Sequence, residues 1–205
     1  IGLELNEKIR EKTGIRILGY WMNLYRNTTN SKRPVVLPDD FKGLKIRVPE
    51  TKTVMDTIAA LGGNPVPMVF GEVYTALQQG IIDGQENPLS IIWASRLYEV
   101  QKYLSLTGHV YSPVVIMISD DFFKKLPEDL RKIVVEAFEE VRPAARKMVE
   151  DQETELVVQL REKGMEVNTV EPEAFQAKMG GVYDDFVKSV GKEAQEFIDR
   201  IKDVR

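Results

Sequence analysis

The hydrophobic positions of this chain follow two patterns, a helical spacing and short apolar runs. Apolar residues recur every three or four positions over 51–61 and, at greater length, over 127–163, which predicts helices. Apolar runs near Gly or Pro at 15–21, 44–48 and 110–119 predict strands. Because predicted strands alternate with short helices, we expect an α/β protein with a mainly parallel sheet.

The same rules divide the rest of the chain. Further helices are expected at 3–12, 71–79, 88–98, 119–125, 172–190 and 192–204, and further strands at 66–69, 81–83, 102–107 and 165–170. The segment 25–38 is polar and rich in Asn, Thr and Pro, so it is expected to be a loop, as is 83–88 before a helix. The helix predicted over 127–163 would measure roughly 50 Å at 1.5 Å per residue. That length exceeds the need of one small domain and favours two lobes that share one helix.

Composition excludes several classes of protein. Of the 205 residues, 43% are hydrophobic and 29% charged, which is ordinary for a folded domain. A net charge of −4 without a clustered basic face argues against a nucleic-acid partner. The chain has no cysteine and a single histidine, His109, so disulfides and zinc sites with several thiolate or imidazole ligands are excluded. We expect no metal and no cofactor, and the apolar runs are too short to span a bilayer.

Three polar residues are candidates for binding a small anion. Arg47 ends the strand 44–48, and ligands of open α/β sheets bind beyond the carboxyl ends of strands. Its planar guanidinium could hold a carboxylate through two hydrogen bonds, although a surface ion pair would explain it equally well. Arg26 lies in the predicted polar loop, where a solvated charge is the alternative. Asn87 precedes a proline and could point into a cleft or cap the next helix.

Other residues are weaker candidates. Phe70, before a predicted helix, is either a ring that covers a ligand's carbon atoms or part of the core. Glu72 and Glu86 could serve as acid and base in a glycosidase, although a glutamate at a helix start also has an electrostatic explanation. His109 is expected to be an ordinary hydrogen-bonded histidine. No motif of a nucleophile elbow, a phosphate-binding loop or a zinc protease occurs, so we expect no catalytic residues.

Several segments resemble one family of transport proteins. Phe41–Pro49, Pro67–Gln78, Asp83–Pro88 and Tyr98–Tyr103 are similar, in this order, to the solute-binding subunit of tripartite ATP-independent periplasmic (TRAP) transporters of the DctP type. The resemblance implies a two-lobed, type II periplasmic-binding-protein-like fold with a long helix crossing both lobes. It also implies a periplasmic protein that captures a small organic acid, such as a C4-dicarboxylate or a uronate, by hinge closure. The partner would be a TRAP membrane permease.

The resemblance assigns roles to residues of this chain. Arg47 matches the family's carboxylate clamp, Asn87 its cleft asparagine, Arg26 its second arginine and Phe70 its aromatic cover. Family members carry a further N-terminal segment, and this chain begins, at Ile1, as if after it. By analogy the first lobe comprises 1–24 and 113–152 and is incomplete, which favours self-association through its exposed faces. The second lobe comprises 25–112 and 153–205.

Three alternatives stay open at this point. One is a hydrolase or lyase on the same lobes that uses Glu72 or Glu86 as a base. Another is a ligand-sensing effector module of a regulator, which would need a DNA-binding helix-turn-helix that these residues do not contain. The last is a fragment that binds nothing without its missing part. The ligand itself is not determined, although Arg33 and the Asn-rich segment favour a hydroxylated acid.

Overall fold

The chain forms two compact units in the computed structural model, which describes residues 2–203 apart from the Leu3 side chain. Unit 1 contains the residues up to Leu24, Ser112–Asp151 and those from Gln195 onward, and unit 2 contains Tyr25–Tyr111 and Gln152–Ala194. The residues from Gln195 onward were expected in the second lobe, but they group with unit 1, where Arg200 pairs with Glu4 at 3.0 Å. Val204, the expected end of the last helix, lies outside the described residues.

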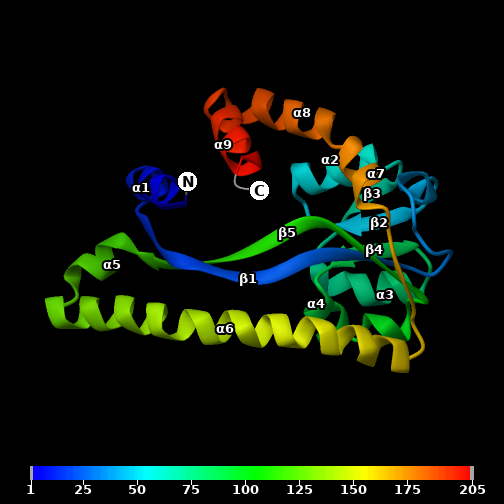
Figure 1. Ribbon diagram of the computed structural model, residues 1–205, viewed down its shortest axis with the longest axis horizontal. Coiled ribbons are helices and arrows are strands. Elements are labelled where there is room, and N and C mark those ends of the chain that lie inside the picture. Colours follow the sequence, from blue (N-terminus) through cyan, green and yellow to red (C-terminus); the bar gives the residue numbers. More distant parts are fainter. Residues whose placement is uncertain (1, 204–205) are drawn as a thin grey trace. The chain divides into compact units, whose positions relative to one another are not determined.

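A sheet of six strands organises unit 2 (Figure 1). Its strands follow the order β3-β2-β4-β1-β5-β6. Strand β2 runs parallel to β3 and to β4, and β5 runs parallel to β6, whereas β1 is antiparallel to β4. The expected mainly parallel sheet is therefore present, with β1 as the exception. The strands are β1 (Ile15–Asn30), β2 (Lys45–Val48), β3 (Asn64–Pro67), β4 (Gly84–Asn87), β5 (Tyr103–Ser119) and β6 (Glu166–Thr169).

Helices cover both faces of this sheet. In Figure 1, α2 and α7 lie on one face, and α3 and α4 on the other. In unit 2 the helices are α2 (Lys52–Ala60), α3 (Val73–Gln78), α4 (Leu89–Ala94), α7 (Pro172–Ala177) and α8 (Gly180–Val190), with short 3-10 turns at Pro38–Phe41, Phe70–Glu72 and Leu97–Glu99. The long helix α6 (Glu128–Glu162) has 35 residues and continues through Pro143.

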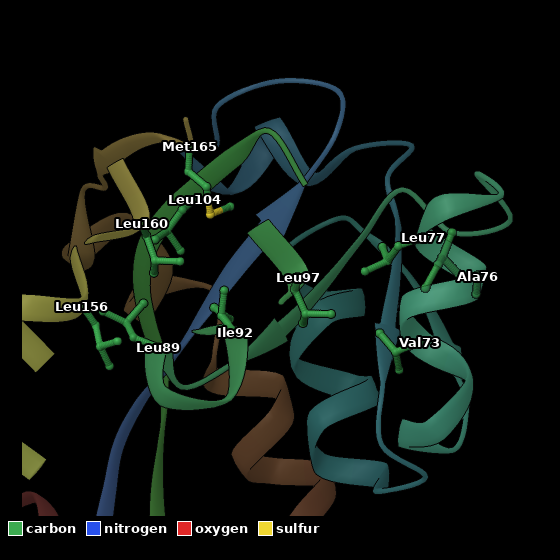
Figure 2. Close-up of a cluster of buried hydrophobic side chains, with 11 residues drawn as sticks. Val73, Ala76, Leu77, Leu89, Ile92, Leu97, Leu104, Leu156, Leu160 and Met165 are labelled. Carbon is green, nitrogen blue, oxygen red and sulfur yellow. The ribbon is translucent and has the colours of Figure 1, made fainter. Parts of the chain in front are cut away.

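Each face of the sheet carries its own hydrophobic core. On one side, Ile46 and Val48 of β2 pack with Phe41 and with Ile58 of α2. The core on the other side joins α3 and α4 to β5 and to the last turns of α6, as Figure 2 shows. Its labelled members are Val73, Ala76, Leu77, Leu89, Ile92, Leu97, Leu104, Leu156, Leu160 and Met165. With both faces covered, the central strands β2 and β4 are buried throughout except at Lys45.

Gly84 allows β4 to lie between its two neighbours. It pairs with Asn30 of β1 on one side and with Ile46 of β2 on the other. A Cβ atom at this position would lie 2.2 Å from the carbonyl oxygen of Thr29 and 2.8 Å from the Cβ of Asn30. Only glycine fits between these strands without displacing backbone.

The two predicted polar loops are wrong where they cover strand residues. Residues 25–30 are the second part of β1, and 84–87 are the central strand β4. Asn27–Asn30 and Gly84–Asn87 are buried, and their polar side chains find partners inside the sheet. Hydrophobic alternation could not detect such strands, because the residues that identify them are polar on both faces.

Other predicted boundaries also change. The strand expected at 81–83 is a turn that leads into β4, and the strands expected at 102–107 and 110–119 are one continuous strand, β5. Gly108 joins the two halves with a φ of +51°, a left-handed conformation that glycine adopts without strain. The expected C-terminal helix pair is three helices, because residues 172–190 divide into α7 and α8 before α9 (Glu193–Lys202).

Unit 1 consists of α1 (Gly2–Thr13), the first part of β1, the last part of β5, α5 (Asp120–Lys125), most of α6 and most of α9. Trp21 of β1 stacks on Phe138 of α6, with ring centroids 6.2 Å apart. Arg16 donates to Asp120 at 2.9 Å and lies over the ring of Phe123. Over residues 2–203, no helix combines the length and the apolar character that crossing a bilayer requires.

Candidate functional site

Arg47 is a buried cation on the central strand β2. Only 4% of its surface is exposed. Its neighbours along the strand, Ile46 and Val48, belong to the core on one face, so the alternation of a strand turns Arg47 toward the opposite face. There its Nε and Nη2 atoms donate to the carbonyl oxygen of Met68, at 2.9 and 2.5 Å.

The residues that follow β3 surround this guanidinium. Strand β3 runs parallel to β2 and pairs Val66 with Arg47, so the chain leaves β3 beside the arginine. Met68 provides the carbonyl that accepts from Nε and Nη2, and the ring of Phe70 lies 5.6 Å from the guanidinium carbon. Phe70 itself is 44% exposed, which places it at the surface rather than in the core.

No carboxylate of the described residues lies within ion-pair distance of Arg47. Burial lowers the pKa of Arg47, and the charge of Arg26 lowers it further, while Glu86 acts in the opposite direction. A guanidinium stays protonated in proteins in spite of such shifts. The site therefore contains a positive charge that has a backbone carbonyl and an aromatic ring beside it but no counterion.

Arg26 and Glu86 form a buried ion pair next to it. Nε of Arg26 donates to one carboxylate oxygen of Glu86 at 2.5 Å, and Nη2 donates to the other at 2.7 Å. The Glu86 side chain is fully buried and that of Arg26 is 15% exposed. Nη2 also donates to the Glu86 carbonyl at 2.7 Å and to Oδ1 of Asn87 at 3.1 Å. This arrangement fixes both residues in one geometry.

His109 lies against the same carboxylate. Its Nε2 atom is 3.3 Å from Oε2 of Glu86 but lies outside hydrogen-bond geometry, and within the described chain it has no other partner. Nδ1 shares a hydrogen bond of 2.8 Å with the hydroxyl of Thr107. Burial acts to raise the pKa of Glu86, but His109 and Arg26 outweigh it, and the pKa of this carboxyl is lowered.

Asn87 connects the ion pair to a second set of buried polar groups. The register of β4 pairs Gln85 with Arg47, and the two-residue period of a strand puts Asn87 on the same face as Gln85. Nδ2 of Asn87 donates to Oε1 of Gln85 at 2.6 Å, while Oδ1 accepts from Arg26. Asn87 is 5% exposed and holds both neighbours, so it does not act as a helix cap.

The structure thus brings the sequence candidates Arg26 and Asn87 into direct contact. Arg47 of the neighbouring strand β2 is paired with Gln85, two residues before Asn87 on β4. Phe70 lies on the guanidinium of Arg47. Glu86, considered from sequence as a base, is the partner of Arg26. Asn87 is also linked by hydrogen bonds to three residues that were not predicted from the sequence, namely Gln85, Thr29 and Gln101. A sequence signal that could have revealed them is the presence of two short polar runs, Asn27–Asn30 and Gln85–Asn87, that can pair as neighbouring strands.

Other parts of the described chain offer less chemistry. A surface hollow of unit 2 is lined by Trp93, Glu155 and Leu156 among others, so it does not include Arg47 or Asn87. Over residues 2–203, no group of His, Asp and Glu side chains has the arrangement of a metal site. Glu72 lies in the 3-10 turn after Phe70 and takes no part in the polar cluster around Glu86.

Comparison with known proteins gives consistent likenesses. A family model described as DctP, bacterial extracellular solute-binding protein, family 7, matches residues 1–189. The chain is 36% identical to the 2,3-diketo-L-gulonate-binding periplasmic protein YiaO of Escherichia coli, in an alignment that covers 98% of this chain and 62% of that protein.

Solved structures show the same likeness. A TRAP periplasmic solute-binding protein of Chromohalobacter salexigens with bound D-glucuronate matches with a TM-score of 0.94 and 33% identity, over 100% of this chain and 67% of that one. A TRAP periplasmic solute-binding protein of Polaromonas bound to D-erythronate matches with a TM-score of 0.86 and 43% identity, over 95% and 64%. These likenesses confirm the expected two-lobed fold. The chain spans about two thirds of the length of these solved relatives and 62% of YiaO.

Proposed function

Because the chain belongs to the DctP family, bacterial extracellular solute-binding protein family 7, we propose that it captures a small organic acid through Arg47. The observation that carries the proposal is the buried guanidinium of Arg47 without a counterion. An unpaired charge of this kind destabilises the protein by several kcal/mol. A carboxylate ligand would provide the missing negative charge at that point.

The surrounding residues suit a carboxylate. Nε and Nη2 of Arg47 are held by Met68, which orients the guanidinium plane, and no described residue accepts from Nη1. Arg26 and Glu86 neutralise one another, so the carboxylate of Glu86 does not balance the charge of Arg47. Phe70 offers an exposed ring to the carbon atoms of the acid, and Asn87 retains an amide hydrogen for one of its oxygens. A direct contact between Arg26 and a second ligand group remains a prediction.

We further propose a hydroxylated sugar acid or a C4-dicarboxylate as the ligand class. The relatives compared above are named for diketogulonate, glucuronate and erythronate, which share one carboxylate and several hydroxyl or carbonyl oxygens. The family and these relatives are binding proteins of transporters and not enzymes. Glu86, the candidate base of the hydrolase alternative, is occupied by Arg26. Capture without conversion is therefore the function that we adopt.

The remaining parts of the proposal concern location and partners. Relatives carry the word periplasmic in their names, and we propose an extracytoplasmic location and delivery of the acid to a TRAP membrane permease. Hinge closure of two lobes and self-association of this chain stay predictions. A permease-reconstituted uptake assay would test delivery, and light scattering would test self-association.

Titration calorimetry tests the clamp. The chain is titrated with D-glucuronate, D-erythronate, 2,3-diketo-L-gulonate and succinate, and the best binder is then measured with Arg47→Lys and with the control Arg16→Lys in unit 1. Lysine keeps the charge but cannot form the planar fork, so Arg47→Lys should weaken binding about a hundredfold. The control should bind as the wild type does. Equal affinity in the wild type and Arg47→Lys would refute the clamp, and a wild type that binds none of these acids would refute the proposed capture.

A further inference from the structure

A chain of buried polar side chains runs from the backbone at Val100 to Asn87. Its members are Gln101, Thr29, Gln85 and Asn87, each with at most 5% of its surface exposed. They come from separate parts of the sequence, but β1 and β4 bring most of them together, because Thr29 pairs with Gln85 in the register of these strands. In each of these hydrogen bonds the donor is the member nearer to Asn87 and the acceptor is the member nearer to Val100. The series of hydrogen bonds therefore has one direction.

At one end of the series, two backbone carbonyls accept from the side-chain amide of Gln101. Nε2 of Gln101 lies 3.0 Å from the carbonyl oxygen of Val100 and 3.4 Å from that of Asp83. Carbonyl oxygens only accept, so this end of the Gln101 amide must be the nitrogen, and Oε1 must face the other way. Oε1 lies 2.8 Å from the Thr29 hydroxyl, which therefore donates its single proton to it.

The same logic fixes the next links. With its proton given to Gln101, the Thr29 oxygen can only accept, and it does so from Nε2 of Gln85 at 2.9 Å. Oε1 of Gln85 then faces Asn87 and accepts from its Nδ2 at 2.6 Å. Oδ1 of Asn87 is left facing Nη2 of Arg26, which only donates, at 3.1 Å. The two ends of the chain therefore require the same amide orientations.

We propose that Gln85, Thr29 and Gln101 are positioning residues that hold the Asn87 amide in a single orientation for ligand binding. The inference rests on the proposed function of the site. In the orientation that they impose, the Asn87 oxygen is occupied by Arg26 and one amide hydrogen by Gln85. The free hydrogen of Nδ2 is what remains for a ligand, so the ligand group at Asn87 must be an acceptor, such as a carboxylate or hydroxyl oxygen.

The chain also couples the amide to residues that no ligand would touch. Gln101 is linked to Asn87 only through Thr29 and Gln85. Its orientation nevertheless sets the direction of the hydrogen bond from Thr29 to Gln101 and of the bond from Gln85 to Thr29. Gln85 is paired with Arg47 in the sheet, so the amide and the guanidinium are held at a fixed separation by neighbouring strands. Loss of one link should therefore lower the affinity of the site even though Arg47 and Asn87 are both intact.

Thr29 provides a matched test. Thr29→Val removes the hydroxyl at nearly constant volume, and Thr29→Ser restores it. Thr57→Val is the control, because Thr57 is also buried, at 6% exposed against 0% for Thr29, but donates to the carbonyl of Thr53 in α2. With D-glucuronate, or the acid that binds best in the calorimetric panel, Thr29→Val should raise Kd about fivefold to tenfold, because it removes both hydrogen bonds of the hydroxyl and frees the Gln85 and Asn87 amides to turn. Thr29→Ser and Thr57→Val should match the wild type. Unchanged affinity in a folded Thr29→Val protein would overturn the proposal.

A ligand-free measurement separates this inference from the proposed function. The side-chain amide of Asn87 is observed by proton–nitrogen NMR, assigned by its loss in Asn87→Asp, and its hydrogen exchange is followed. Gln101→Met should speed this exchange about tenfold, because it ends the series of hydrogen bonds, whereas Thr57→Val, which lies outside the series, should leave the rate unchanged. Equal rates in the wild type and Gln101→Met would overturn the inference. Protection of the amide in a protein that binds no acid would support the inference while refuting the capture of an acid.

Discussion

Replacement of Glu86 by glutamine should strongly destabilise unit 2. The substitution keeps the shape of the side chain but removes the charge that balances Arg26, and it leaves one oxygen where two accept from the guanidinium. Breaking a buried ion pair costs about 3–5 kcal/mol when both charges are fully buried. Arg26 is 15% exposed and can regain some hydration, so we expect a cost below this range, about 2–3 kcal/mol.

Urea unfolding followed by tryptophan fluorescence measures this cost. Trp93 lies in unit 2 and Trp21 in unit 1, so a Trp21→Phe background makes the signal specific to unit 2. Glu166→Gln serves as the control, because Glu166 pairs with Lys102 at the surface and such pairs contribute at most about 1 kcal/mol. A free energy of unfolding for Glu86→Gln within 0.5 kcal/mol (about the precision of the assay) of the wild type would refute the reasoning.

The pH dependence gives a second check. The pKa of Glu86 is lowered in the folded protein, because His109 and Arg26 outweigh the opposing effect of burial. A carboxyl group with a lowered pKa contributes stability above its unfolded pKa of about 4.3, and this stability is lost as the pH falls through the lower folded value. Wild-type unit 2 should therefore lose stability more steeply below about pH 4 than Glu86→Gln does. Parallel curves for the two proteins would contradict the assignment.

Three further predictions concern packing and the site. Gly84→Ala should lower the melting temperature by several degrees, because its Cβ would lie 2.2 Å from the Thr29 carbonyl oxygen, whereas Gly71→Ala, with open space around it, should not; calorimetric unfolding compares them. Phe138→Ala should cost about 3–4 kcal/mol in unit 1 and change the fluorescence of the stacked Trp21 in urea titrations, and no change in either would exclude the packing role. Phe70→Ala should weaken binding of the panel acid about threefold to tenfold by calorimetry while leaving the melting temperature unchanged, since 44% of the Phe70 surface is exposed and neither core cluster includes it. A melting temperature that falls with the affinity would show that the ring is structural.

The sequence predicted the parts of the fold that bury apolar side chains. The strand that ends near Arg47 and the helices over 51–61 and 127–163 are found at nearly the expected bounds, because their apolar spacing has a clear period. It failed for the second half of β1 and for β4. The buried side chains of these two strands are Asn, Thr, Gln and Glu. They point to alternate faces as in any strand, but because they are polar they give no hydrophobic pattern.

The same limit applies to the site. Arg47 could be named as a candidate from its place at a strand end and Asn87 from the proline that follows it, and the family resemblance gave each its expected role. The ion pair of Arg26 with Glu86 joins residues that are 60 positions apart, so no local pattern reveals it. The orientation of the Asn87 amide depends on Thr29 and Gln101, whose relation appears only when β1 and β4 are paired. Pairing of polar strands is thus the information that was missing.

A guanidinium that is buried without a counterion has a practical consequence for work with this chain. Small anions of the growth medium or the buffer, such as acetate, citrate or chloride, would also be attracted to the unpaired charge of Arg47. Purified samples would then contain a mixture of occupants, and every measured affinity would be a competition with the buffer. Exchange into a large, weakly coordinating anion before titration would separate intrinsic from apparent affinity.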